Sequence, residues 1–201
     1  MKIGSGNNSA DSRFPHPAWI VAAVGFDMYC RLLDEAVKEV KGLPPDESTE
    51  PRLITDAAAF LPDEYVTDAE EKIALYKRLA DAREIPAVDT LEAELADRFG
   101  KLSPEARVLF DLRRLRILGR HAGATLIQVR GTVIDVELAN PPTKELLKAW
   151  MQRLTVPVEF AAGARFGLKV KKTGPDPVGL AGQLLKQLIG EPAPAESALS
   201  K

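Results

Sequence analysis

The helix predicted over residues 103–121 constrains the fold more than any other feature, because it is apolar on two sides. Ser103 marks its start, since a serine hydroxyl accepts a hydrogen bond from the first turn, and Pro104 fits the first helical position. Its apolar side chains recur at three- and four-residue spacing in two groups: Val108, Leu109, Leu112 and Leu115, then Phe110 and Ile117. We therefore expect this helix to lie mostly inside a domain.

Other helices are predicted ahead of it. One covers residues 26–40, and a second follows Thr67 and Glu70, which have the spacing of a capping box. Pro86 is then expected to break the chain. Asp89 or Thr90 can cap a third helix, which Gly100 ends, and its apolar side is formed by Leu91, Leu95 and Phe99.

Beyond residue 121 the pattern changes to strands mixed with helices. One strand is expected earlier in the chain, because a short apolar stretch over residues 52–60 is typical of an edge strand. The later strands are predicted over residues 125–129, 132–138, 156–161 and 165–171, and the later helices over residues 143–154 and 178–189. The predicted class is α+β, with a helical N-terminal half packed with a small mixed or antiparallel sheet and C-terminal helices.

Length and composition indicate one domain with tails. The chain has 201 residues, of which 45% are hydrophobic and 28% are charged, and this is typical of a globular domain. Residues 1–19, rich in Gly, Ser, Asn and Pro, are expected to be a flexible lead-in. The domain is expected over residues 20–190, and residues 191–201 are expected to form a disordered tail.

The charge balance and the lone cysteine limit the function classes. The 27 basic and 29 acidic residues give a net charge of −2, which argues against a strongly electrostatic nucleic-acid binder. Cys30 has no second cysteine to pair with, no apolar run is long enough to cross a bilayer, and no secretory signal is present. We expect a cytoplasmic protein without a membrane contact.

The motifs in the sequence predict no enzyme, no metal and no cofactor. His16 and His121 are the only histidines, too few for a typical zinc or iron site. Neither a nucleophile elbow nor a phosphate-binding glycine loop ending in Gly-Lys-Ser/Thr occurs. Cys30 lies on the apolar face of its predicted helix, which is typical of a small buried residue rather than a reactive thiol.

Two sets of charged residues remain. Glu94 and Asp97 share a helix face turned away from the apolar side, and Arg98 can pair with Glu94 one turn on. Composition alone favours a solvated face over an acidic docking patch for a basic partner. The second set, Arg113, Arg116 and Arg120, forms a cationic stripe on the central helix. Internal ion pairing is the favoured interpretation of this stripe, and a nucleic-acid-binding face is the alternative.

Four strings, in this order and spacing, resemble a known family. They are V-G-F-D-M-Y at residues 24–29, F-L-P-D-E-Y-V at residues 60–66, I-A-L-Y-K-R-L at residues 73–79 and E-L-A-D-R-F-G at residues 94–100. Together they resemble the C-terminal domain of the bacterial transcription-repair coupling factor, Mfd. The match is strong over residues 20–124 and looser through residue 189.

The resemblance implies a regulatory role. Members of this family are DNA translocases that remove stalled RNA polymerase and recruit the repair protein UvrA, and their C-terminal domain masks the N-terminal UvrA-recruiting module. The E-L-x-D-R-F-G segment lies at that contact. The resemblance therefore favours Glu94, Asp97 and Arg98 as partner-binding residues, and it implies only indirect links to UvrA, RNA polymerase and DNA.

One departure from the family is expected to matter. The motor segment that precedes this domain in full-length members is echoed only by Gly4-Ser5-Gly6-Asn7, and the helicase motifs are absent from the sequence. The chain is therefore predicted to be either a fragment or a stand-alone remnant, without the motor's ATPase.

Overall fold

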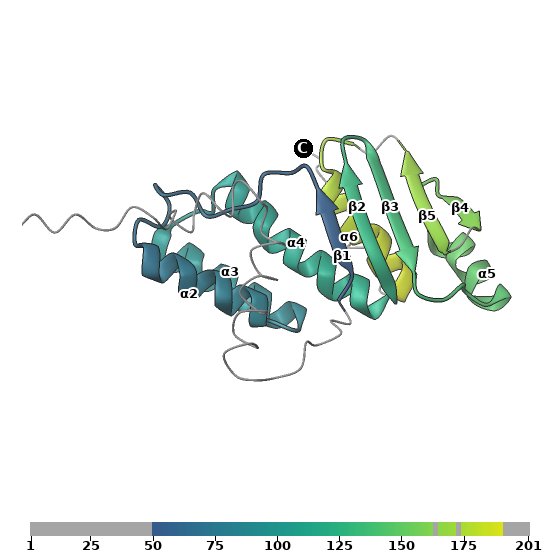
Figure 1. Ribbon diagram of the computed structural model, residues 1–201, viewed down its shortest axis with the longest axis horizontal. Coiled ribbons are helices and arrows are strands. Elements are labelled where there is room, and N and C mark those ends of the chain that lie inside the picture. The colour runs from purple at the N-terminus through teal and green to yellow at the C-terminus, as the bar shows by residue number, and fades with distance from the viewer. Residues whose placement is uncertain (1–49, 163–164, 172–173, 191–201) are drawn as a thin grey trace, which may run out of the picture.

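The fold was taken from a computed structural model, which describes residues 50–162, 165–171 and 174–190. The helix predicted over residues 26–40, the lead-in, the tail and the tip of the predicted hairpin lie outside these described residues. Within them a short first strand is followed by three helices and then by a strand-rich half (Figure 1). The predicted α+β class is confirmed.

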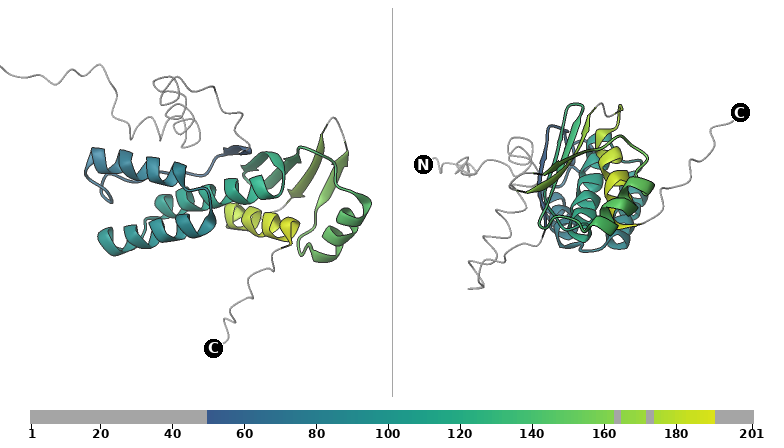
Figure 2. Two further views of the ribbon diagram at one scale, coloured as in Figure 1. Left: turned by 90° about the horizontal axis from the view of Figure 1, so that it is seen from below. Right: turned by 90° about the vertical axis from the view of Figure 1, so that its right-hand side faces the viewer.

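Helix α4 (Pro104–His121) runs through the middle of the fold. Ser103 accepts a hydrogen bond from the Ala106 amide at 3.1 Å, so the predicted start is confirmed. Helices α2 (Ala69–Asp81) and α3 (Ile85–Phe99) pack on one part of α4, and α6 (Pro177–Ile189) and strand β2 pack on another (Figures 1 and 2). Both apolar groups of α4 are thereby covered, as its pattern predicted.

The starts of α2 and α3 differ from the predicted ones. Asp68, not Thr67, caps α2, because the Asp68 carboxylate accepts a hydrogen bond from the Glu71 amide at 2.7 Å. Pro86 does not break the chain but lies in the first turn of α3, where a missing amide hydrogen costs nothing. The predicted caps Asp89 and Thr90 were therefore wrong, since both lie inside the helix.

Five strands form one mixed sheet in the described part of the chain, in the order β1-β2-β3-β5-β4. Strand β1 (Arg52–Thr55) pairs in parallel with β2 (Ala124–Arg130), whereas β3 (Val133–Leu138), β5 (Phe166–Lys171) and β4 (Glu159–Ala162) join by antiparallel pairing. The predicted edge position of β1 is confirmed. It ends sooner than predicted, at Thr55, whose hydroxyl accepts a hydrogen bond from the Ala57 amide.

Among the described residues, helices cover one face of the sheet. Helices α4 and α6 contact β2, and α6 also contacts β3. The side chains buried on this face include Ile127, Val129, Ile134, Val136, Leu168 and Val170. Helix α5 (Lys144–Arg153) is attached to α6 by Trp150, whose indole N–H donates to the Leu188 carbonyl at 2.9 Å. The other face carries charges such as the Lys169–Asp135 pair at 3.2 Å.

Two helical glycines should respond in opposite ways to alanine. A Cβ at Gly119 in α4 would lie 2.5 Å from Ile127 Cδ1 and 2.7 Å from Pro51 Cγ, whereas at Gly182 in α6 the nearest atom is 4.0 Å away. We expect Gly119→Ala to lower the free energy of unfolding by about 1–3 kcal/mol through overpacking. Gly182→Ala should raise it by about 0.5–1 kcal/mol through helix propensity.

Urea unfolding of the two variants measures both changes. Equal effects of the two substitutions would contradict the close approach of α4 to β1 and β2 at Gly119.

Candidate protein-interaction surface

A chain of ion pairs joins α2 to α3 on the surface of the helical layer. Arg78 of α2 binds Glu94 of α3 through two hydrogen bonds, Nη1 to Oε1 at 2.8 Å and Nη2 to Oε2 at 2.5 Å. Arg98 of α3 pairs with Glu71 of α2 and lies 3.9 Å from Glu94. We call Glu94, Asp97 and Arg98, with their α2 partners Arg78 and Glu71, the α3 surface.

The two predicted acids on α3 have different surroundings. The hydrogen bond from Arg78 lowers the pKa of Glu94, outweighing the opposite effect of desolvation. The negative charge of Glu94 is compensated by the guanidinium of Arg78. Asp97 is exposed, and among the described residues it has no hydrogen-bond or ion-pair partner. Asp97 therefore offers its full charge to a partner, whereas Glu94 is shared with Arg78.

An aromatic pair supports the end of α3. The Arg98 guanidinium lies 5.0 Å from the centre of the Phe99 ring, and that ring lies 5.9 Å from the Tyr65 ring. The Tyr65 hydroxyl donates to the Gly100 carbonyl at 3.0 Å, and Gly100 ends the helix at a φ of 82°. These contacts fix the direction in which Arg98 leaves the helix.

Sequence patterns missed Arg78 and Glu71, which complete this surface. The predicted partner of Glu94 was Arg98, one turn away, but the closer partner is Arg78 on the neighbouring helix. No periodicity within one helix gives the rotation of α2 against α3. The I-A-L-Y-K-R-L string that carries Arg78 supplied the only signal available in the sequence.

The cationic stripe of α4 points into the molecule. Arg113 is 2% exposed and donates to the Ala82 carbonyl at 2.7 and 2.9 Å and to the Glu50 carboxylate at 2.8 and 2.9 Å. Arg116 is buried 3.8 Å from Glu50, and desolvation lowers its pKa to about 10. Arg120 binds Glu84 at 3.1 Å and the Arg83 carbonyl at 2.8 Å. These contacts favour the ion-pair interpretation over a nucleic-acid-binding face.

Glu50 is the acid at the centre of this cluster. Desolvation raises its pKa, but the hydrogen bonds and charge of Arg113, with the charges of Arg83 and Arg120, outweigh it and lower the pKa below 4.5. Its carboxylate therefore ties the chain ahead of β1 to α4 and, through Arg113, to Ala82 at the end of α2.

A small cavity of about 260 Å³ lies where α3, α4 and α6 meet. Its apolar wall includes Leu115, Leu118 and Val178, and Arg114 at its rim pairs with Asp89 at 2.6 Å and Asp111 at 3.0 Å. Desolvation raises the pKa of Asp111, against the effect of Arg114. Arg114, Asp89 and Asp111 are thus already paired with one another.

Two further features are absent from the described residues. There, no group of three or more His, Cys, Asp or Glu side chains is arranged to hold a metal ion. None of the helices in these ranges combines the length and the apolar character needed to cross a bilayer.

Comparison with known proteins defines the class of domain. The crystal structure of a C-terminal domain of transcription-repair coupling factor matches with a TM-score of 0.61 at 19% identity, covering 70% of this chain and 94% of that one, so the fold is shared. The family model of the TRCF domain matches residues 55–149. These residues are a TRCF domain, and the resemblance inferred from the four strings is confirmed.

Two relatives are much longer than this chain. The transcription-repair-coupling factor of Myxococcus xanthus is 33% identical over 195 residues, 92% of this chain. The factor of Staphylococcus aureus (strain USA300) is 34% identical over 128 residues, 63% of this chain. The chain spans only 15% and 11% of the lengths of these two relatives.

Removal of the Glu50 charge should give a pH-dependent loss of stability. Because the folded-state pKa of Glu50 lies below its usual value of 4.5, its contribution is full above that value and lost as the pH falls through the folded pKa. Glu50→Gln should lower the free energy of unfolding by about 3 kcal/mol at neutral pH, because Arg113 stays buried with a weaker partner.

Urea unfolding at several pH values measures this loss. The difference from the unsubstituted chain should shrink below pH of about 4.5. Glu159→Gln, which removes the exposed partner of Lys171, is the control and should cost less than about 1 kcal/mol. A loss for Glu50→Gln that is the same at every pH would refute the assignment.

Proposed function

We propose that this TRCF domain is a regulatory protein-interaction domain of a transcription-repair coupling factor. In this proposal the α3 surface docks on the module that recruits UvrA and masks it. The observation that carries the proposal is the pair of acids on α3, in which Asp97 has no partner among the described residues and Glu94 is held by an exchangeable arginine.

The proposed mechanism is competition for a basic surface. Asp97 makes the first contact with a basic partner, because no internal cation must be displaced. Glu94 can then exchange Arg78 for an arginine or lysine of the partner at little cost, since exposed ion pairs contribute little to stability. Docking of this kind is reversible, which suits a surface that must be released when UvrA binds.

The proposal also covers the extent of the domain and the activities of its longer relatives. The regulatory domain is proposed to extend over residues 20–190. Translocation on DNA and displacement of RNA polymerase are proposed to belong to other parts of full-length relatives, because this chain matches only a small share of their length. Contacts with UvrA, RNA polymerase and DNA would then be indirect.

Charge reversal on α3 should weaken docking. Titration calorimetry of the full 201-residue chain with the isolated UvrA-recruiting module should show that Glu94→Lys/Asp97→Lys weakens binding more than tenfold, about 1.4 kcal/mol. Glu64→Lys/Asp81→Lys reverses two other exposed acids, one in the turn ahead of α2 and one at the end of α2, and should leave the affinity within about twofold.

Single substitutions separate the two acids. Asp97→Asn should weaken docking more than Glu94→Gln, because only Asp97 offers an unshared charge, and Arg78→Met should strengthen docking by releasing Glu94. Unchanged affinity in the double charge-reversal variant would show that docking does not use α3.

A further inference from the structure

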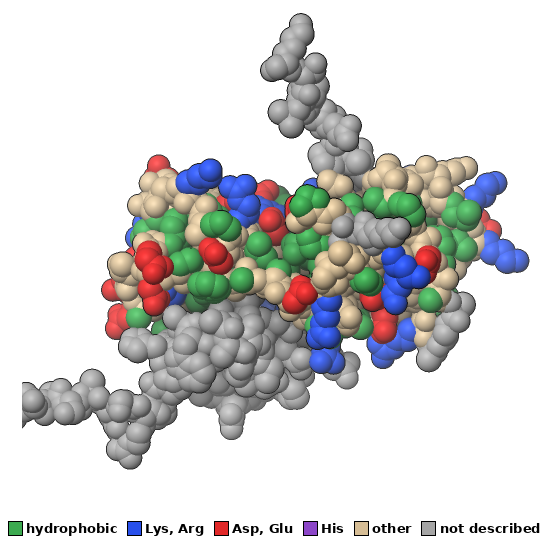
Figure 3. Space-filling model, turned by 90° about the horizontal axis from the view of Figure 1, so that it is seen from above, with side chains coloured by type: hydrophobic (Ala, Val, Ile, Leu, Met, Phe, Trp, Pro, Cys, Tyr) green, Lys and Arg blue, Asp and Glu red, His purple; other side chains and the backbone are tan. Residues whose placement is uncertain are grey.

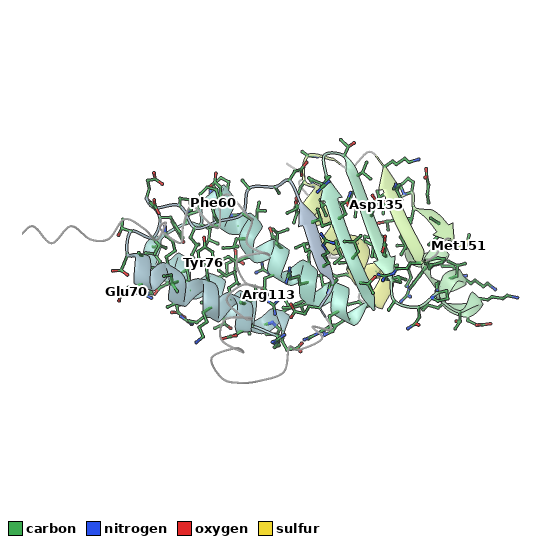
Figure 4. The ribbon with its side chains drawn as sticks, in the orientation of Figure 1. Phe60, Glu70, Tyr76, Arg113, Asp135 and Met151 are labelled. Atoms are coloured by element: carbon green, nitrogen blue, oxygen red, sulfur yellow. The ribbon has the colours of Figure 1, made fainter. Side chains whose placement is uncertain are left out.

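Exposed apolar side chains gather at the end of the molecule opposite to α3. Among the described residues, the large exposed hydrophobic ones are Leu146 (39% exposed) and Met151 (69%) on α5 and Phe160 (36%) on β4. Figure 4 shows Met151 at this end, far from Glu70 on α2. Helix α5 buries Trp150 against α6 but leaves the flanks of its apolar side uncovered.

Strand β4 provides an open edge beside these side chains. It is the last strand of the described sheet and pairs only with β5 there. Glu159, Phe160 and Ala161 are all exposed. The backbone amides and carbonyls along an edge of this kind can pair with an added strand.

The same end is basic. Residues 139–171 contain six basic and two acidic side chains, whereas residues 63–99 contain eleven acidic and five basic ones. Three of the six basic ones, Arg165, Lys169 and Lys171, pair with Glu137, Asp135 and Glu159, so the uncompensated cations of this end are those of α5. Figure 3 shows acidic side chains toward the α2–α3 end and basic ones projecting at the other. On α5, Lys144, Lys148 and Arg153 have no ion-pair partner among the described residues.

We propose that the surface formed by α5 and β4 binds an extended acidic segment of a partner protein, which adds to the sheet as a strand beside β4. The partner's apolar side chains pack on Met151 and Phe160, and its carboxylates lie near Lys144 and Lys148. The apolar anchors favour a protein over nucleic acid, because the phosphate backbone is bound through charge and hydrogen bonds alone.

This surface is separate from the α3 surface. Figure 1 places α2 and α3 at one end of α4, with α5 and β4 at the other end of the molecule. The two surfaces also select opposite charges, so an acidic segment bound at β4 leaves α3 free for a basic partner. The domain can therefore hold two partners at once.

The test uses fluorescence anisotropy with the full chain and a labelled eight-residue peptide of alternating glutamate and valine. We expect saturable binding of this peptide and none of a lysine–valine peptide of equal length. Lys144→Glu/Lys148→Glu should weaken binding at least about tenfold, and Met151→Gln about threefold or more. The matched control Lys77→Glu/Lys101→Glu reverses two exposed lysines of the helical layer and should leave the affinity unchanged.

Other results would overturn the proposal. Binding that survives Lys144→Glu/Lys148→Glu, or no binding of the acidic peptide at all, rejects the surface. Equal affinity for a peptide with N-methylated alternate amides rejects strand addition. If Lys144→Glu/Lys148→Glu lost binding to a 20-base-pair DNA duplex but kept binding to the peptide, the surface would be one that binds phosphate groups. Every substituted side chain is exposed, so we expect the variants to keep the thermal midpoint of the unsubstituted chain. Unchanged midpoints would exclude unfolding as the cause of any loss of binding.

Discussion

The burial of α4 is the constraint on which the rest of the structure depends. The helix has to be covered both by the α2–α3 layer and by the sheet with α6, and Arg113 makes this possible although it carries a charge into the interior. Its guanidinium donates four hydrogen bonds to the Glu50 carboxylate and the Ala82 carbonyl, so the cost of desolvating the guanidinium is offset by hydrogen bonds. The end of α2 and the chain entering β1 are both positioned by this one side chain.

The two exposed surfaces follow from that arrangement. Because α4 is covered by different partners along its length, the domain is elongated, and its two ends are formed by different kinds of structure. One end presents helix faces rich in carboxylates, and the other presents the open strand β4 beside α5, whose Lys144, Lys148 and Arg153 have no ion-pair partner among the described residues. A net charge of −2 describes neither end. Averages over a whole chain therefore hide the property that decides which partners each end attracts.

Local chemistry explains which parts of the fold could be predicted from sequence. Ser103-Pro104, Thr143 and Gly100 mark helix boundaries through their own hydrogen bonds or backbone angles, and the structure places boundaries there. Pro86 was misjudged because proline suits the first turn of a helix as well as it breaks an interior. The partner of Glu94 was also missed, because Arg78 reaches it across helix packing that no local pattern encodes. Glu50 was not singled out for the same reason, as its partner Arg113 lies 63 positions away.

The parallel pairing of β1 with β2 has a mechanical consequence. Helices α2, α3 and α4 all lie between these two strands in the sequence, so the sheet edge closes only when a long loop of chain has been brought together. Tension applied at residue 50 would load the β1 ladder and, through the Glu50–Arg113 pair, the side of α4 before it reached α2 or α3. The four-residue β1 would then detach first, exposing the edge of β2 while the helical layer stayed packed. A domain built in this way can yield at this edge of its sheet without losing its core.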